Sequence, residues 1–178
     1  MKATHLTLLC HGQTEAQRVG RFHLADDPLL LIPPPQTTPH ATHLLTAPEL
    51  RTRQTAEAFG LDAQTDNDLR DYDLGHWAGM SLKHLQQDDP ASLQRWLADP
   101  HATPHQGESI AQLCQRVAVW MDNLPALGRW QAVTHPMVIR AALLHVLECP
   151  LDAFHRIDVQ PLSEVQFSRH GQWRLRIS

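Results

Sequence analysis

Short apolar runs recur along this chain, most of them ending at a turn residue or a histidine. A run of three to five such residues is typical of a buried strand, because strands inside a sheet are apolar on both faces. Alternating apolar and polar positions on the two sides of Gly171 instead predict a hairpin. The segments predicted as strands are residues 6–10, 43–46, 132–134, 164–168 and 173–177.

Longer segments repeat apolar residues at three- and four-residue steps, as amphipathic helices do. Proline in the first turn of a helix presets the backbone, so Pro48 predicts a helix that holds Arg51 in its first turn and runs to about Phe59. Asp89 has the form of a helix cap. Further helices are predicted after Pro90, over residues 110–124 and over residues 137–147.

The alternation of strands and helices decides the predicted fold class. It favours an α/β three-layer sandwich, with a mostly parallel central sheet and helices on both faces. Residues 26–40 contain five prolines, which exclude a regular helix, so this segment is predicted to lie over the surface. With 178 residues, the chain has the length of one domain, predicted to span residues 1–178.

Composition narrows the class of partner and the compartment. A formal net charge of -4 gives no electrostatic reason to expect nucleic acid or an anionic membrane surface. The N-terminal apolar run is too short for a signal peptide, and no stretch approaches a membrane span. Cys10, Cys114 and Cys149 are odd in number and scattered, which favours a reducing compartment, the cytoplasm. The oligomeric state stays open.

Three polar residues stand at the ends of predicted elements. His11 follows the first strand, Arg51 lies at a helix start, and His135 follows the third strand and precedes another helix. Because ligands in open α/β sheets bind beyond the carboxyl ends of the strands, we expect these side chains to share one site. Helix N-termini attract anions, so a phosphate group is the expected guest.

Five blocks in order along the chain carry a further signal. The sequence reads LLCHGQTE, APELRTRQTA, LRDYDLGHWAG, GES and VTHPMVIRA. This order resembles the phosphoglycerate mutase-like branch of the histidine phosphatase superfamily. The corresponding family motifs include Arg-His-Gly-x-Thr, Ser-Pro-Leu-x-Arg-Ala-x-Gln-Thr-Ala, Leu-x-Glu-x-x-x-Gly-x-Trp-Glu-Gly and Val-Ser-His-Gly-Gly-Val-Ile-Arg. The resemblance implies a phosphoglycerate mutase-like fold and a small phosphorylated molecule as ligand.

The resemblance also implies a reaction, the hydrolysis of a phosphomonoester through a phosphohistidine without metal or other cofactor. His11 would attack phosphorus, and Arg51 and His135 would stabilise the phosphoryl oxygens. Asp71 falls on the acid that protonates the leaving group, although a capping or solvated carboxylate remains an alternative at this position. The further phosphate-binding residues implied by the resemblance are Gly12, Gln17 and Arg21. The 13 histidines form no metal-binding motif.

The chain departs from the family pattern beside the nucleophile. Cys10 replaces the motif's arginine, and a thiol offers neither fixed charge nor paired hydrogen bonds to phosphate. We expect Cys10 to be a buried, inert residue. Ala78 and Pro136 replace a glutamate and a glycine of the later motifs. Two functions therefore stay open, a phosphatase of weak or narrow activity, and a non-catalytic relative that binds an anionic ligand or acts as an interaction module.

Overall fold

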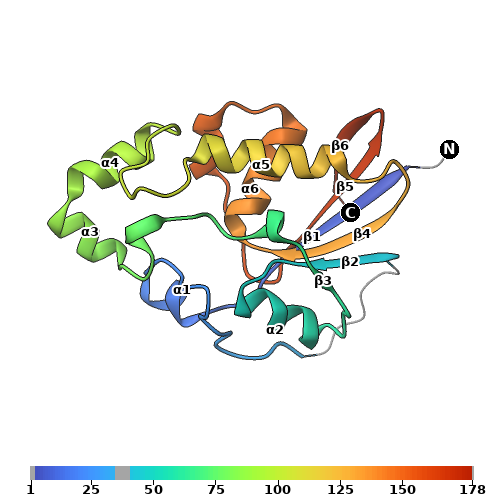
Figure 1. Ribbon diagram of the computed structural model, residues 1–178, viewed down its shortest axis with the longest axis horizontal. Coiled ribbons are helices and arrows are strands. Elements are labelled where there is room, and N and C mark those ends of the chain that lie inside the picture. The colour runs from blue at the N-terminus through green and yellow to red at the C-terminus, as the bar shows by residue number, and fades with distance from the viewer. Residues whose placement is uncertain (1–2, 35–40, 178) are drawn as a thin grey trace.

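The computed structural model describes residues 3–34 and 41–177, which form one six-stranded sheet with helices packed against it (Figure 1). The strands follow the order β3-β2-β4-β1-β5-β6. The first four of these are parallel to one another, whereas β5 runs antiparallel to β1 and pairs with β6 in a hairpin. Their bounds are Thr4–Cys10 for β1, His43–Thr46 for β2, Gln64–Thr65 for β3, Gly128–Thr134 for β4, Glu164–His170 for β5 and Gln172–Arg176 for β6.

Helices cover both faces of the sheet, which confirms the predicted α/β class (Figure 1). The helices are α1 (Glu15–Val19), α2 (Leu50–Ala58), α3 (Leu82–Asp88), α4 (Pro90–Ala98), α5 (Ile110–Asn123) and α6 (Pro136–Leu147). Short 3₁₀ turns are η1 (Asn67–Leu69), η2 (Gly75–Trp77) and η3 (Leu151–Arg156).

The side chains of β1 alternate between two cores, because successive residues of a strand point to opposite faces. Leu6 and Leu8 pack in the larger core with residues of α5, α6 and η3. Leu9 packs on the other face, in a small core with Ala56 and Phe59 from the end of α2. The sheet is therefore the middle layer of a three-layer sandwich.

Most predicted elements lie where the pattern placed them, and the differences have local causes. Strand β4 begins at Gly128, four residues before the predicted start, because residues 128–131 pair with β1 without forming an apolar run. Helices α1 and α3 and the two-residue strand β3 were not predicted. Residues 26–34 contain no helix, as expected, and the prediction for residues 35–40 lies outside the described residues. Within the described part of the chain, every helix is too short or too polar to cross a bilayer.

Candidate active site

The register between two central strands brings two histidines together. Cys10 of β1 pairs with Thr134 of β4 in a parallel ladder, so the residue after each strand emerges at the same edge. These residues are His11 and His135, and their ring centroids lie 5.3 Å apart, with both rings fully buried. Two imidazoles at this separation are close enough to contact one phosphoryl group.

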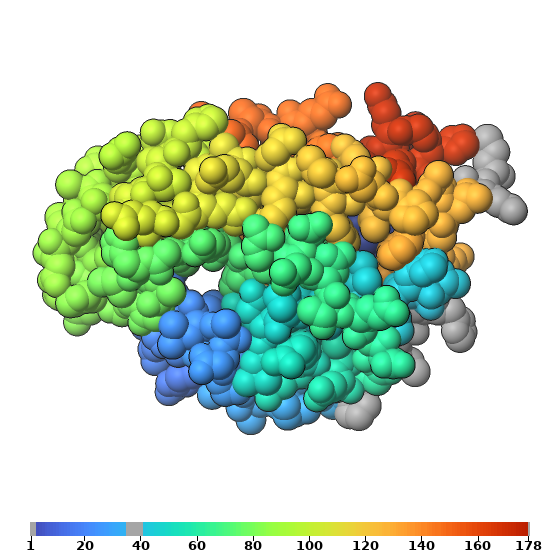
Figure 2. Space-filling model, in the orientation of Figure 1, coloured from blue at the N-terminus to red at the C-terminus, as the bar shows by residue number. Residues whose placement is uncertain are grey.

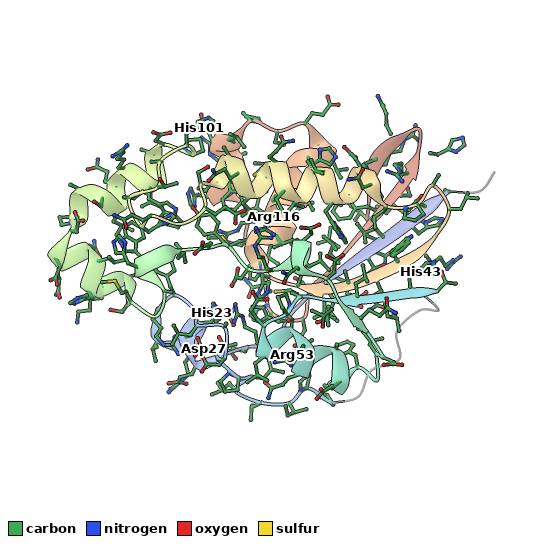
Figure 3. All side chains as sticks on the ribbon, viewed as in Figure 1. His23, Asp27, His43, Arg53, His101 and Arg116 are labelled. Atoms are coloured by element: carbon green, nitrogen blue, oxygen red, sulfur yellow. The ribbon has the colours of Figure 1, made fainter. Side chains whose placement is uncertain are left out.

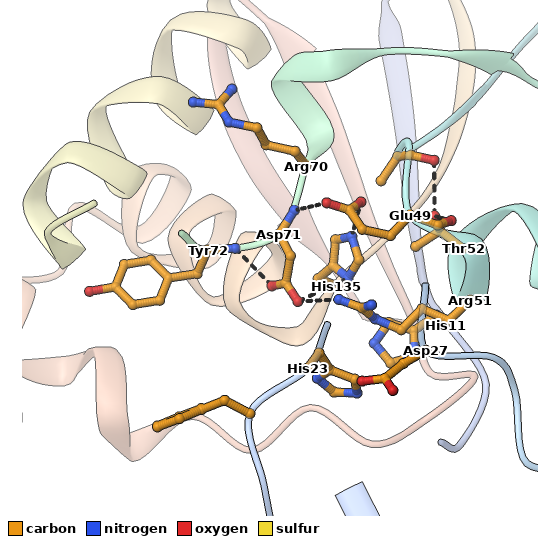
Figure 4. A network of polar contacts seen from close by, with 12 residues as sticks. His11, His23, Asp27, Glu49, Arg51, Thr52, Arg70, Asp71, Tyr72 and His135 are labelled. Carbon is orange, nitrogen blue, oxygen red and sulfur yellow. Dashed lines mark hydrogen bonds and ion pairs between the residues drawn. The ribbon is translucent and has the colours of Figure 1, made fainter. Parts of the chain in front are cut away.

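An arginine and a carboxylate complete the cluster (Figure 4). Helix α2 follows β2, the neighbour of β4, and places Arg51 in its first turn with only 1% of its side chain exposed. The Arg51 guanidinium forms an ion pair with Asp71 and donates to the Leu24 carbonyl oxygen at 2.9 Å. The Asp71 carboxylate also accepts from the Tyr72 N–H at 2.8 Å and lies 3.4 Å from His135 Nδ1. It thus lies between the arginine and the second histidine.

The surroundings of His11 fix its tautomer. Its Nδ1 lies 2.7 Å from the Gly12 carbonyl oxygen, which can only accept, so Nδ1 carries the proton. The other ring nitrogen, Nε2, is buried and has no hydrogen-bond partner among the described residues. Burial and the neighbouring His135 and Arg51 charges hold the pKa of His11 well below its usual value. His11 is therefore a neutral imidazole with a free lone pair on Nε2, the state required of a nucleophile.

Asp71 is ionised in this arrangement. Burial alone would raise its pKa, but the charges of His135 and Arg51 outweigh burial and hold the pKa well below its usual value. Asp71 therefore contacts Arg51 and His135, two of the residues predicted to bind phosphate. To donate a proton, Asp71 must first be protonated, which an incoming dianion beside it would favour.

Two further side chains belong to this cluster and were missed from the sequence. Glu49, the residue before α2, directs its carboxylate to His135 Nε2 at 2.8 Å. His23 packs its ring 5.5 Å from His11 and pairs its Nε2 with the Thr14 hydroxyl at 2.7 Å. Burial, followed by the Arg51 charge, lowers the pKa of His23 to about 4. A charged residue at the leucine position of the second motif was the signal for Glu49.

The other predicted phosphate ligands already have partners. The Gly12 N–H donates to the Thr55 hydroxyl at 3.0 Å. The Gln17 side-chain oxygen accepts from the Thr14 N–H at 3.1 Å and so caps α1. Arg21 forms a two-pronged ion pair with Asp27, at 2.6 and 2.9 Å. Gln17 and Arg21 nevertheless line the pocket beside the site, whereas Gly12 lies behind His11 and orients its ring.

Cys10 contributes no charge to the site. The thiol is fully buried, and burial followed by the Asp71 charge raises its pKa to about 12. A thiol with this pKa is neutral at pH 7 and donates only weak hydrogen bonds. The expectation that Cys10 is buried is confirmed, and its raised pKa is in line with the expected inert role.

A pocket of about 460 Å³ opens beside the charged cluster. Figure 2 shows the molecule hollowed between the blue N-terminal segment and the green segment that follows β3. Glu49, Arg51 and Asp71 form one wall of the pocket, and much of the remaining wall is apolar. The apolar residues are Phe22, Leu24, Ala25, Leu74, Ala78, Pro136 and Met137. The volume is in the range of small-molecule sites.

The remaining histidines do not add to this cluster in a way that suits a metal. In Figure 3, His101 lies at the upper left, His23 below it and His43 at the right, so these three histidines are spread apart. Over residues 3–34 and 41–177, no group of three or more histidine, cysteine or acidic side chains has the geometry to hold a metal ion.

Fold and site together define a class, α/β proteins in which histidine, arginine and carboxylate side chains converge at the carboxyl edge of a mostly parallel sheet. The family model of the histidine phosphatase superfamily, branch 1, matches residues 37–177. The chain belongs to this superfamily. The matched range begins after the segment that holds Cys10 and His11.

Two mycobacterial proteins are among those similar in sequence. A bifunctional protein of Mycobacterium tuberculosis is 29% identical over 98% of this chain and 53% of its own length, so the chain spans about half of that relative. Glucosyl-3-phosphoglycerate phosphatase of M. tuberculosis is 27% identical over 79% of this chain and 71% of its own length. Both are similar in sequence to most of the chain.

Solved structures share the fold. The native mycobacterial glucosyl-3-phosphoglycerate phosphatase superposes with a TM-score of 0.79 at 22% identity, covering 99% of this chain and 98% of that chain. Phosphoserine phosphatase of Entamoeba histolytica, solved with 3-phosphoglyceric acid, gives a TM-score of 0.80 at 21% identity and covers 97% and 94%. At these identities the superpositions establish the common fold.

Proposed function

We propose that the protein is a metal-independent phosphatase that hydrolyses a small phosphomonoester through a phosphohistidine at His11, with weak or narrow activity. One observation carries this proposal. The His11 ring is neutral, its Nε2 is buried without a partner among the described residues, and the side chains of Arg51 and His135 lie beside it. This is the arrangement of an activated nucleophile next to groups that stabilise a phosphoryl group.

The proposed reaction has two steps. His11 Nε2 attacks phosphorus, the bond to the ester oxygen breaks, and protonated Asp71 gives its proton to the departing alcohol. Water then attacks the phosphohistidine while the Asp71 carboxylate takes a proton from it, and inorganic phosphate leaves. Arg51 and His135 bind the equatorial phosphoryl oxygens in both steps, where the transition-state charge resides.

The relatives support the ligand class. The names of the similar proteins are those of phosphatases of glucosyl-3-phosphoglycerate and phosphoserine, which are small phosphorylated molecules. A pocket of about 460 Å³ fits a ligand of this size. The three free cysteines support the cytoplasm as the proposed compartment.

One feature favours a second candidate, a non-catalytic protein that binds an anionic ligand. Arg51 and His135 already face the carboxylates of Asp71 and Glu49, and Cys10 adds no charge. A lost arginine contact of this kind lowers the rate by about 30- to 1,000-fold. We prefer the phosphatase, with weak activity, because the proposed nucleophile is intact.

The test uses an aryl phosphate in the presence of a chelator, because a good leaving group needs little help from Asp71. We expect slow hydrolysis, loss of hydrolysis in His11→Ala, and an acid-labile phosphoryl group on His11 in quenched wild-type protein. His101→Ala, which removes an exposed histidine, is the matched control and keeps the activity. Activity that survives in His11→Ala refutes the proposed nucleophile. Saturable phosphate binding without hydrolysis supports the second candidate.

A further inference from the structure

The Glu49 carboxylate contacts residues of the site and does not cap its own helix. It occupies the N-cap position of α2, yet its side chain makes no capping hydrogen bond. One oxygen lies 2.8 Å from His135 Nε2, and the other accepts from the Asp71 N–H at 3.0 Å. Only 11% of the side chain is exposed. Glu49 therefore connects the start of α2, the start of α6 and the segment that carries Asp71.

The two ring nitrogens of His135 both face carboxylates. Nε2 lies 2.8 Å from Glu49, and Nδ1 lies 3.4 Å from Asp71. A neutral imidazole can donate from only one nitrogen, whereas the imidazolium can donate from both. The other charged or titratable neighbours are Arg51, which is itself paired with Asp71, and the two histidines His11 and His23, whose lowered pKa values keep them neutral. Two carboxylates thus face the two nitrogens of one imidazole ring.

The pairing also acts on Glu49. Burial opposes the ionisation of Glu49, but the hydrogen bond and the charge of His135 outweigh burial and hold the pKa of Glu49 below its usual range. Near pH 7 Glu49 is therefore a carboxylate.

We propose that Glu49 is a positioning residue that holds the His135 ring through Nε2 and favours the form of the ring that can also donate from Nδ1 to the phosphoryl group. The family motif has a leucine at this position and an arginine where Cys10 stands. The Glu49–His135 pair thus orients a donor in a site that lacks that arginine. This inference rests on the proposed phosphatase function for its effect on catalysis, but the protonation state of His135 does not depend on it.

The chemistry has precedent in carboxylate–histidine pairs, where a carboxylate on one ring nitrogen sets the orientation and protonation of the other. For histidines that bind a metal, loss of such a partner lowers affinity or activity by about 10- to 100-fold, and we take this as the scale of the expected effect. In Glu49→Gln the amide keeps nearly the size of the side chain but removes its charge. His135 Nε2 then faces a neutral amide in place of a carboxylate, which removes an attraction that favours a protonated ring.

The decisive experiment is a pH titration of the histidine ring nitrogens by ¹⁵N–¹H NMR, with His135 assigned by the signals lost in His135→Asn. We expect the His135 midpoint to fall by one pH unit or more in Glu49→Gln, with Glu49→Asp between this variant and the wild type. Glu57→Gln, an exposed glutamate on the same helix, is the matched control and leaves the midpoint unchanged. An unchanged midpoint in Glu49→Gln overturns the proposal.

Ligand binding and kinetics separate positioning from structural support. Vanadate affinity and aryl phosphate kcat/KM are expected to fall about 10- to 100-fold in Glu49→Gln at pH 7, with the alkaline limb of the pH profile moved to lower pH. A lower melting temperature without any change in affinity or pH profile shows a merely structural role and refutes positioning. If Glu49→Gln does not fold, Glu49→Leu, which carries the motif residue, replaces it. Should the wild type prove inactive, the proposed function fails, while the NMR titration and vanadate binding still decide the role of Glu49.

Discussion

Replacing Arg51 by methionine tests whether the same guanidinium holds the site together and binds the anion. Arg51 is 1% exposed and its partner Asp71 is 20% exposed, so Arg51→Met leaves a mostly buried carboxylate without its cation. Breaking a buried ion pair in this way costs about 3–5 kcal/mol. Because Asp71 keeps the Tyr72 N–H and the nearby His135, we expect the lower end, about 3 kcal/mol. In a chain of this length that loss lowers the melting temperature by about 6–12 °C.

The double variant Arg51→Met/Asp71→Asn separates stability from function. Removing the stranded carboxylate is expected to restore about 1–2 kcal/mol, while phosphate and vanadate affinity stay reduced by about 100-fold or more. Melting curves and calorimetric titration on the same samples measure both quantities. Arg53→Met, an exposed position on the same helix, controls for the loss of any arginine and changes stability by less than about 0.5 kcal/mol. Anion affinity that returns in the double variant would show that Arg51 is not the anion's partner.

Three further predictions concern packing and acid. Cys10→Arg places a long side chain in fully buried space and is expected to lower the free energy of unfolding by about 1–3 kcal/mol. A tenfold gain in aryl phosphate hydrolysis with an unchanged melting temperature would contradict this. The pKa of Asp71 is lower in the folded than in the unfolded state, so ionised Asp71 stabilises the fold above its unfolded pKa near 4, and this stabilisation is lost as the pH falls. The melting temperature is therefore expected to drop less between pH 7 and pH 3 in Asp71→Asn than in the wild type. An equal drop would refute this. Gly75→Ala puts a Cβ 2.1 Å from the His105 carbonyl oxygen at a positive φ and is expected to lower the free energy of unfolding by more than about 3 kcal/mol. Gly20→Ala, also at positive φ but in open space, is the control and is expected to lower it by about 1 kcal/mol in the same unfolding assay.

The strands and helices predicted correctly from the sequence are those in which the spacing of apolar residues within the segment itself shows which face is buried. Strands β1 and β2 and helix α5 carry their apolar pattern locally, so their existence follows from the residues they contain. Helix α1 was missed although Thr14 and Gln17 form a capping box that the sequence displays. Strand β3 has two exposed residues and forms because it pairs with β2, which no local pattern shows.

Some features of the site likewise follow from the sequence, whereas others depend on the tertiary structure. That His11, Arg51 and His135 converge follows from a general property of parallel sheets, and the structure brings the three together. The Glu49–His135 contact depends on the side-chain direction of one N-cap residue and on the neighbouring positions of β2 and β4. Asp71 reaches the cluster on irregular chain after η1, where neither period of regular structure applies. The resemblance to the family motif identified Asp71, but only the structure shows its ion pair with Arg51.

The position of β4 in the sheet has a consequence for the order in which the molecule can fold. Strand β4 lies between β1 and β2 and is the partner of both, so these two early strands have no pairing with each other. A strand encoded far along the chain therefore sets the spacing between the strands that precede His11 and Arg51. Such non-local pairing is slow, because the entropy of closing a long loop is lost before the contacts form. We therefore expect the charged cluster to form only after β4 has paired with both of its neighbours, and its polar groups to stay in water until then.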